Sequence, residues 1–162
     1  MRVSPRFTLA AASLAATALA LALAGPAHAQ ATKPLQVQET SIEGVNAELI
    51  EAVRKEGVLT IKVRYRNTGS QPAKVAFIGD LRDADKYYVV AGSTKYLVLK
   101  DTQKIPLMNA LDHYNNLAAD LKPAGSFLFW AKYPAPPAEA KKFNLHTPHG
   151  PPFEDVPIAE AK

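Results

Sequence analysis

The residues from 59 to 66 alternate strictly between apolar and polar side chains. In an extended strand, this alternation places one set on each face: Leu59, Ile61, Val63 and Tyr65 on one, and Lys62, Arg64 and Arg66 on the other. A strand with one apolar and one charged face is typical of an antiparallel sheet that covers a core on one side only. The pattern therefore predicts a protein built from antiparallel sheets.

Shorter apolar or alternating runs, separated by Gly, Pro and Asn, predict six further strands. They cover residues 35–39, 74–78, 87–90, 96–100, 126–133 and 143–146. Several short strands with turn signals between them indicate a sandwich or a barrel. The chain contains no cysteine, so a packed core has to hold this fold without disulfides.

Two segments are also compatible with helix. Residues 46–56 place Leu49, Ile50 and Val53 at helical spacing, but they could equally form a hairpin with the strand that follows. We favour the hairpin, because a strand as regular as residues 59–66 needs a neighbour. Residues 108–121 carry one apolar stripe at helical spacing, and there we expect a short helical crossover of one or two turns.

The N-terminus has the three parts of a bacterial signal peptide. Arg2 and Arg6 form a positive start, residues 7–24 are all apolar or small, and Ala27-His28-Ala29 is a cleavage site of the small-x-small type. An uncleaved membrane anchor is the alternative, but the run is rich in alanine and the cleavage site follows at once. We therefore predict that residues 1–29 are a signal peptide.

The predicted mature protein begins at Gln30 and is a single domain over residues 30–162, either periplasmic or secreted. Its net charge falls from +4 to +2, because two of the arginines lie in the leader. Such a small excess does not provide the basic patch that nucleic-acid binding requires. We expect no nucleic-acid partner, and no membrane-spanning segment after cleavage.

Three stretches of the C-terminal half form recognisable motifs: LKPAGS at residues 121–126, WAKYPAPP at 130–137 and PPFEDVPI at 151–158. Together with residues 59–69, they resemble a family of exported bacterial immunoglobulin-like domains of unassigned function. The resemblance spans roughly residues 57–158, although Ala124 precedes Gly125 where a plain Pro-Gly turn is typical, and residues 92–120 match nothing in the family pattern. It implies an immunoglobulin-like antiparallel β-sandwich and brings no catalytic residues.

The motif at residues 130–137 suggests a structural role and a surface role. Trp130 lies among aromatic residues in a predicted strand, and we expect its indole in the core. The prolines that follow cannot donate hydrogen bonds to a neighbouring strand, so they end it. A proline-rich loop can also serve as a recognition surface, which makes Pro136 and Pro137 candidates for binding.

The charged face of residues 59–66 is a second candidate surface. Lys62, Arg64 and Arg66 lie about 6.6 Å apart along one strand, so they could contact an anionic envelope polymer, a lipid or an acidic partner. In the alternative interpretation this face is merely solvated, with carboxylates such as Glu51 on a neighbouring strand to neutralise it.

Residues that could support metal binding or catalysis are few. His146 and His149 could share a metal, but zinc needs three or four ligands, and no cysteine or third clustered histidine accompanies them. We expect both to be exposed loop residues. Asp112 and His113 could form an acid–base pair, yet no nucleophile stands in a recognisable context. The aspartates between residues 80 and 85 lack the spacing of a calcium loop.

The sequence therefore predicts a non-enzymatic binding or structural module of the bacterial envelope, without a cofactor, whose partner is an envelope protein or an anionic envelope polymer. The candidate contact residues are Lys62, Arg64, Arg66, Pro136, Pro137, His146 and His149. The alternative function is a small periplasmic carrier of a metal or another ligand that uses His146 and His149.

Overall fold

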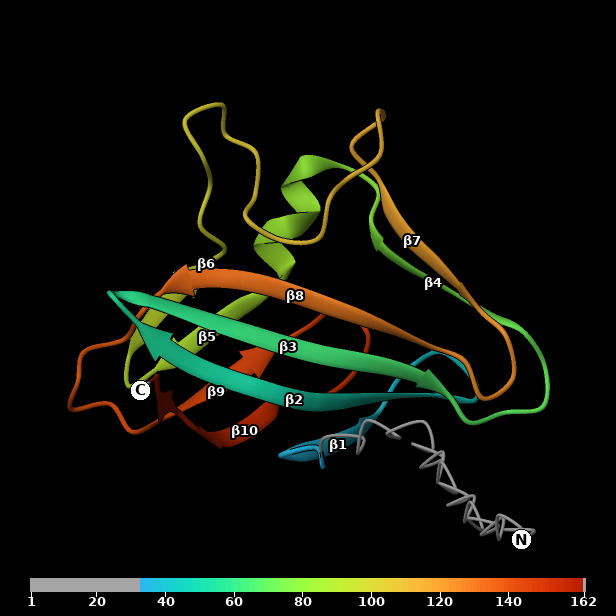
Figure 1. The fold of residues 1–162 in the computed structure, drawn as a ribbon, viewed down its shortest axis with the longest axis horizontal. Coiled ribbons are helices and arrows are strands. Elements are labelled where there is room, and N and C mark those ends of the chain that lie inside the picture. The colour runs from blue at the N-terminus through green and yellow to red at the C-terminus, as the bar shows by residue number, and fades with distance from the viewer. Residues whose placement is uncertain (1–32, 162) are drawn as a thin grey trace, which may run out of the picture. The chain divides into compact units, whose positions relative to one another are not determined.

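Three sheets make up the fold in the computed structural model, which describes residues 33–161 (Figure 1). The first sheet has the order β1-β2-β3-β8, and a short parallel strand, β11, adds to β2. Its strands are β1 (Gln36–Glu39), β2 (Val45–Lys55), β3 (Val58–Asn67), β8 (Ser126–Pro134) and β11 (Ala159–Glu160). The predicted signal peptide lies outside the described residues.

The second sheet has the order β10-β9-β5-β6, and β4 and β7 form a separate pair. The strands of these two sheets are β4 (Ala73–Ile78), β5 (Tyr88–Ala91), β6 (Thr94–Leu97), β7 (Leu117–Leu121), β9 (Lys142–His146) and β10 (Phe153–Pro157). A short 3-10 helix, η1 (Leu81–Lys86), joins β4 to β5. The prediction of an all-β protein with antiparallel sheets is therefore confirmed.

Side chains of both larger sheets fill one core, in a sandwich-like arrangement. In Figure 1, β2, β3 and β8 lie in front of β5, β9 and β10, and the buried residues of these strands belong to one cluster. The four apolar residues of β3 that were expected to face inward are each at most 2% exposed: Leu59, Ile61, Val63 and Tyr65. Alternation along this strand therefore predicted its inner face correctly.

The segment 46–56 is a strand, which confirms the predicted hairpin with β3. The pairing runs from Val45 opposite Asn67 to Lys55 opposite Val58, with one register shift between Leu49 and Glu51. Such a bulge inserts one residue and reverses which positions face inward. Before it the odd-numbered residues are buried, and after it Ala52 and Arg54 are buried. Of the three residues at helical spacing, only Leu49 is buried, whereas Ile50 and Val53 are partly exposed.

The predicted helical crossover at residues 108–121 is wrong. Residues 117–121 form β7, paired with β4, and the preceding residues form a loop that turns at Asp112. The Asp112 side chain accepts hydrogen bonds from the backbone N–H groups of Tyr114 and Asn116 at 2.8 Å each. Leu117 and Leu121 are buried, as the helical interpretation also predicted. Two residues four apart lie on the same side of a strand as well as of a helix, so their burial fits both structures. The strand β4 was available as a partner, so pairing prevailed over the local helical pattern.

Trp130 is on the outer face of the first sheet, so the prediction of a core indole is also wrong. Its neighbours Phe129 and Ala131 are buried, and Trp130 lies directly opposite Lys62 of β3. Residues that stand opposite one another in a sheet share a face. The charged side chain of Lys62 and the indole therefore lie side by side, and the indole is only partly buried.

Candidate binding site

Two carboxylates of β2 pair with the three cations of β3, Lys62, Arg64 and Arg66. Lys62 Nζ lies 3.0 Å from Glu51 Oε2, Arg64 Nε donates to Glu48 Oε2 at 2.6 Å, and Arg66 Nε lies 3.3 Å from Glu48 Oε1. Cross-strand pairing places these carboxylates on β2 opposite the cations on β3. The geometry supports a solvated, charge-paired face rather than a surface for anions.

The proline-rich loop after β8 is held from beneath by Arg54. This residue is 8% exposed, and its guanidinium donates to the carbonyl oxygens of Pro136 at 3.2 Å, Pro137 at 2.8 Å and Ala140 at 2.7 Å. It also forms an ion pair with Glu160 at 3.4 Å. Pro136 is buried, so its ring does not offer the contact surface that was expected, whereas Pro137 is exposed.

The two candidate histidines have different surroundings. His146 lies on the outer face of β9 with its ring stacked on Tyr88, with centroids 4.4 Å apart and planes at 9°. His149 is half-buried, because its ring packs edge-on against Tyr65 and Phe77. The expectation that both are exposed loop residues is therefore wrong. Among residues 33–161, no group of three or more potential ligands could hold a metal ion.

The aspartates that suggested catalysis or calcium stabilise local turns. Asp80 caps η1 by accepting from Arg82 N at 2.9 Å, and Asp83 accepts from the backbone N–H groups of Gly79 and Asp80. The backbone N–H of Asn116 lowers the pKa of Asp112, as expected for a carboxylate that closes a turn. Each of these side chains has a structural role that requires no ligand.

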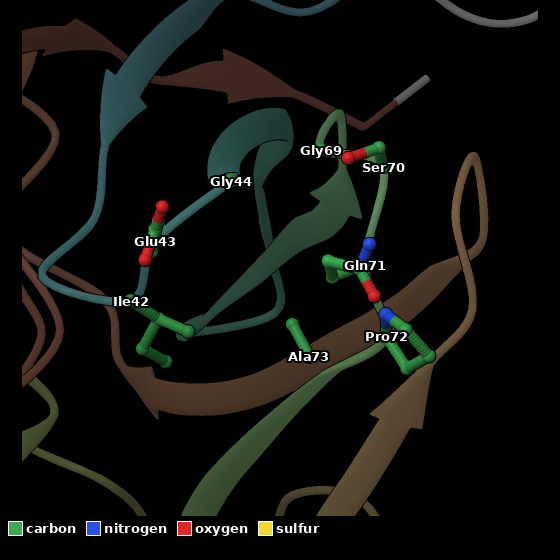
Figure 2. Close-up of a pocket in the computed structure, with 8 residues that line it drawn as sticks. All are labelled: Ile42, Glu43, Gly44, Gly69, Ser70, Gln71, Pro72 and Ala73. Atoms are coloured by element: carbon green, nitrogen blue, oxygen red, sulfur yellow. The ribbon is translucent and has the colours of Figure 1, made fainter.

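A pocket of about 410 Å³ opens between the loop joining β1 to β2 and the loop joining β3 to β4 (Figure 2). The lining residues are Ile42, Glu43, Gly44, Gly69, Ser70, Gln71, Pro72 and Ala73. Figure 2 shows Ile42 and Glu43 on one wall and the run from Ser70 to Ala73 on the other. We call this feature the end pocket.

Asn67 makes the second wall of the end pocket rigid. It is 1% exposed, its side-chain amide donates to Gln71 O at 2.7 Å and to Leu121 O at 3.0 Å, and its side-chain oxygen accepts from Gly69 N at 2.9 Å. A buried amide with all these bonds made stabilises one conformation, because breaking any of them would leave a buried polar group unpaired. The loop is thus fixed to the end of β3 and to β7.

The two walls meet at a pair of glycines. Gly44 O accepts hydrogen bonds from Thr68 N at 2.7 Å and Gly69 N at 3.2 Å. A Cβ atom at Gly44 would lie 3.1 Å from Gly69 Cα, and Gly44 has a φ of +71°. Both facts favour glycine, so this close contact between distant loops depends on its presence.

The lining of the end pocket combines one carboxylate with several apolar side chains. Glu43 is the only charged side chain that lines it, and it forms no ion pair with any residue between 33 and 161. Ile42, Pro72 and Ala73 supply apolar contact. A ligand with a positive charge beside a short hydrocarbon segment fits this lining, whereas an anion would be repelled by Glu43.

Sequence reasoning missed this site. Residues 67–72 are recognisable as a loop from their Asn-Thr-Gly-Ser-Gln-Pro composition, which is the one signal that points there. Nothing in the sequence shows that Asn67 is buried or that Gly44 contacts Gly69, because these contacts join residues that are distant in the chain.

Comparison with protein-family models, curated proteins and solved structures found no match to this chain. Within residues 33–161, no helix combines the length and the hydropathy needed to cross a bilayer.

Proposed function

We propose that this chain is an exported, non-enzymatic binding module of the bacterial envelope, with an immunoglobulin-like sandwich as its frame and the end pocket as its contact site. The observation that carries the proposal is the end pocket itself, one wall of which is fixed by the fully bonded, buried Asn67. A pre-formed site loses little conformational entropy when it binds, so rigidity of this kind favours recognition. Loops presented by a rigid sheet frame are also common binding elements.

Charge favours one of the two predicted classes of partner. The stripe of Lys62, Arg64 and Arg66 was the reason to expect an anionic polymer. These three side chains form ion pairs with Glu48 and Glu51. The end pocket instead presents the carboxylate of Glu43. An envelope protein that inserts a lysine or arginine side chain fits this site, because such a side chain combines a cation with an apolar stem.

The motif residues support the proposed family, because they occupy positions that shape the fold. Gly125 N donates to Lys122 O at 2.8 Å, which closes the turn into β8. A Cβ at Gly125 would lie 2.8 Å from the same oxygen, so glycine is required there. The tail motif supplies β10 with the buried side chains of Phe153 and Val156. Export is proposed from the leader sequence alone.

Site-specific photo-crosslinking in the producing bacterium tests the proposal. A photoreactive residue at Ser70, on the rim of the end pocket, should capture a discrete envelope protein. The same residue at Ala118, which is exposed on β7 outside the pocket, is the control and should not capture it. Glu43→Lys should abolish the adduct at Ser70, and Glu139→Lys, a matched reversal at an exposed position elsewhere, should preserve it. Equal capture at both positions, or an adduct that is insensitive to Glu43→Lys, would refute the proposal.

A further inference from the structure

His149 occupies an aromatic corner that the proposed binding function leaves unexplained. Its ring meets Tyr65 at 5.8 Å and Phe77 at 5.7 Å between centroids, in both cases with planes at 87°. The residue belongs to the loop between β9 and β10, whereas the aromatic rings come from β3 and β4. The imidazole therefore ties this loop to the interior of the sandwich.

The hydrogen bonds of Tyr87 indicate that Nε2 of the His149 imidazole carries a proton. Tyr87 Oη lies 3.1 Å from Phe77 O and 3.2 Å from His149 Nε2. A phenol has one proton, and a carbonyl oxygen can only accept, so Tyr87 donates to Phe77 O. The Tyr87 oxygen then accepts a hydrogen bond from Nε2–H of His149.

The loop that carries His149 also supports one wall of the end pocket. His149 O accepts a hydrogen bond from Ser41 N at 2.6 Å. Gly150 is packed so closely against the same segment that an added Cβ would lie 2.7 Å from Glu39 O. Ser41 immediately precedes Ile42 and Glu43, which line the pocket. The position of the wall therefore depends on the position of the loop.

The groups around His149 do not compensate a positive charge on its ring. Burial lowers the pKa of His149 below its ordinary value of 6.5. The titratable groups that face it are Tyr65 and Tyr87, and burial raises the pKa of each phenol, so both stay neutral near pH 7. Tyr133, whose own pKa is raised by burial, and Asp83 both act on the pKa of Tyr87, whereas neither acts on the pKa of His149.

The segment that the loop contacts carries two carboxylates, Glu39 and Glu43. Glu39 and Glu43 are both exposed, and desolvation alone accounts for the lowered pKa of His149. No carboxylate among these groups is thus placed to stabilise an imidazolium.

We propose that His149 is an acid-sensitive latch on the end pocket: the neutral imidazole holds its loop and the adjoining wall in place, and protonation releases both. The latch would regulate the end pocket. It rests on the proposed binding function only for the ligand that the pocket would release. A pocket of this kind binds near neutral pH and loosens in acid.

The direction of the pH effect follows from proton linkage. The opened loop exposes His149 with its ordinary pKa of 6.5, and the closed loop holds it at a lower pKa. The closed state is therefore fully favoured above about pH 6.5 and loses stability as the pH falls toward the lower value. Because each opening then takes up one proton, the opening constant rises by up to ~10-fold for each pH unit in that interval.

Amide hydrogen exchange of the mature protein between pH 7.5 and 5 tests the latch without any ligand. After correction for the intrinsic rates, the backbone N–H groups of Ser41 and Val45, which are bonded to His149 O and Ile42 O, should lose protection as the pH falls. His149→Gln keeps an amide N–H near Tyr87 but cannot titrate, so its profile should be flat. The matched control, His146→Gln on the outer face of β9, should retain the wild-type profile.

A second measurement applies even if His149→Gln does not fold. NMR titration of the wild-type imidazole should show the Nε2–H tautomer and a pKa below 6.5. A pKa at or above 6.5, a wild-type exchange profile that does not change with pH, or a His149→Gln variant that keeps the wild-type slope would each overturn the latch. Failure of the crosslinking test together with a positive exchange result would refute the binding function and leave the latch as a conformational switch.

Discussion

Replacing Phe129 by alanine should destabilise the protein by about 3–5 kcal/mol, whereas replacing its neighbour Trp130 should cost about 1 kcal/mol or less. Phe129 is 3% exposed, and its ring packs against Tyr87 at 4.7 Å and Phe77 at 5.5 Å between centroids. Its removal would leave a cavity where β8 packs against β4 and the residue that ends η1. Trp130 lies on the outer face, opposite Lys62, so its removal takes away a cross-strand contact and leaves the core intact.

Urea unfolding followed by circular dichroism measures both changes on one scale, because the Trp130→Ala variant has no indole to report by fluorescence. Fluorescence gives an independent check, since Trp130 is the only tryptophan of the chain. Its native emission should be red-shifted relative to a buried indole, and iodide or acrylamide should quench it.

The reasoning fails if Trp130→Ala destabilises as much as Phe129→Ala, or if the native emission is blue and protected from quenchers. Either result would mean that β8 faces the core with its even-numbered residues. The pairing of β8 with β3 would then have to shift by one residue, because a one-residue slip exchanges the two faces of a strand.

Three further predictions concern the end pocket, one turn and the leader. Asn67→Ala should lower the free energy of unfolding in urea by about 1–3 kcal/mol, because the buried carbonyl of Leu121 loses its donor. NMR should show new motion in residues 68–72. An unchanged unfolding midpoint would contradict the role of Asn67 in fixing the loop. Ala124→Gly should stabilise the protein by about 1 kcal/mol and raise the melting temperature, because Ala124 has a φ of +61°, where glycine is less strained than alanine. A lower melting temperature would contradict this prediction. Mass spectrometry of the exported protein should find Gln30 at its N-terminus, and a mature form that retains residues 9–23 would identify an anchor instead.

Local patterns in the sequence predicted most of the strands and the inner face of β3. Alternation works at residues 59–66 because a regular strand that is buried on one side shows its period directly. The predicted ranges for β1, β4, β5, β8 and β9 agree with the structure to within one residue at each end, whereas β6 lies two to three residues earlier than expected. β7, β10 and β11 were not predicted as strands; all three are short, and β10 lies within the proline-rich tail motif.

Tertiary contacts determined which face of a strand is buried and which neighbouring strand it pairs with. The bulge in β2 turned Arg54 inward, where it holds the proline loop, and no local pattern signals that reversal. The pairing of β8 with β3 placed Trp130 beside Lys62, although its aromatic neighbours suggested a core position. Residues 117–121 became a strand because β4 lay beside them.

The candidate site was decided by contacts between residues far apart in the chain. Asn67 reaches Leu121, Gly44 contacts Gly69, and His149 is held by rings from β3 and β4. The sequence alone determined an all-β chain without disulfides, and a leader that predicts export. Local composition encodes where a chain turns and which strand face is apolar. It does not encode which loops meet, because that depends on the free energy of packing the whole core.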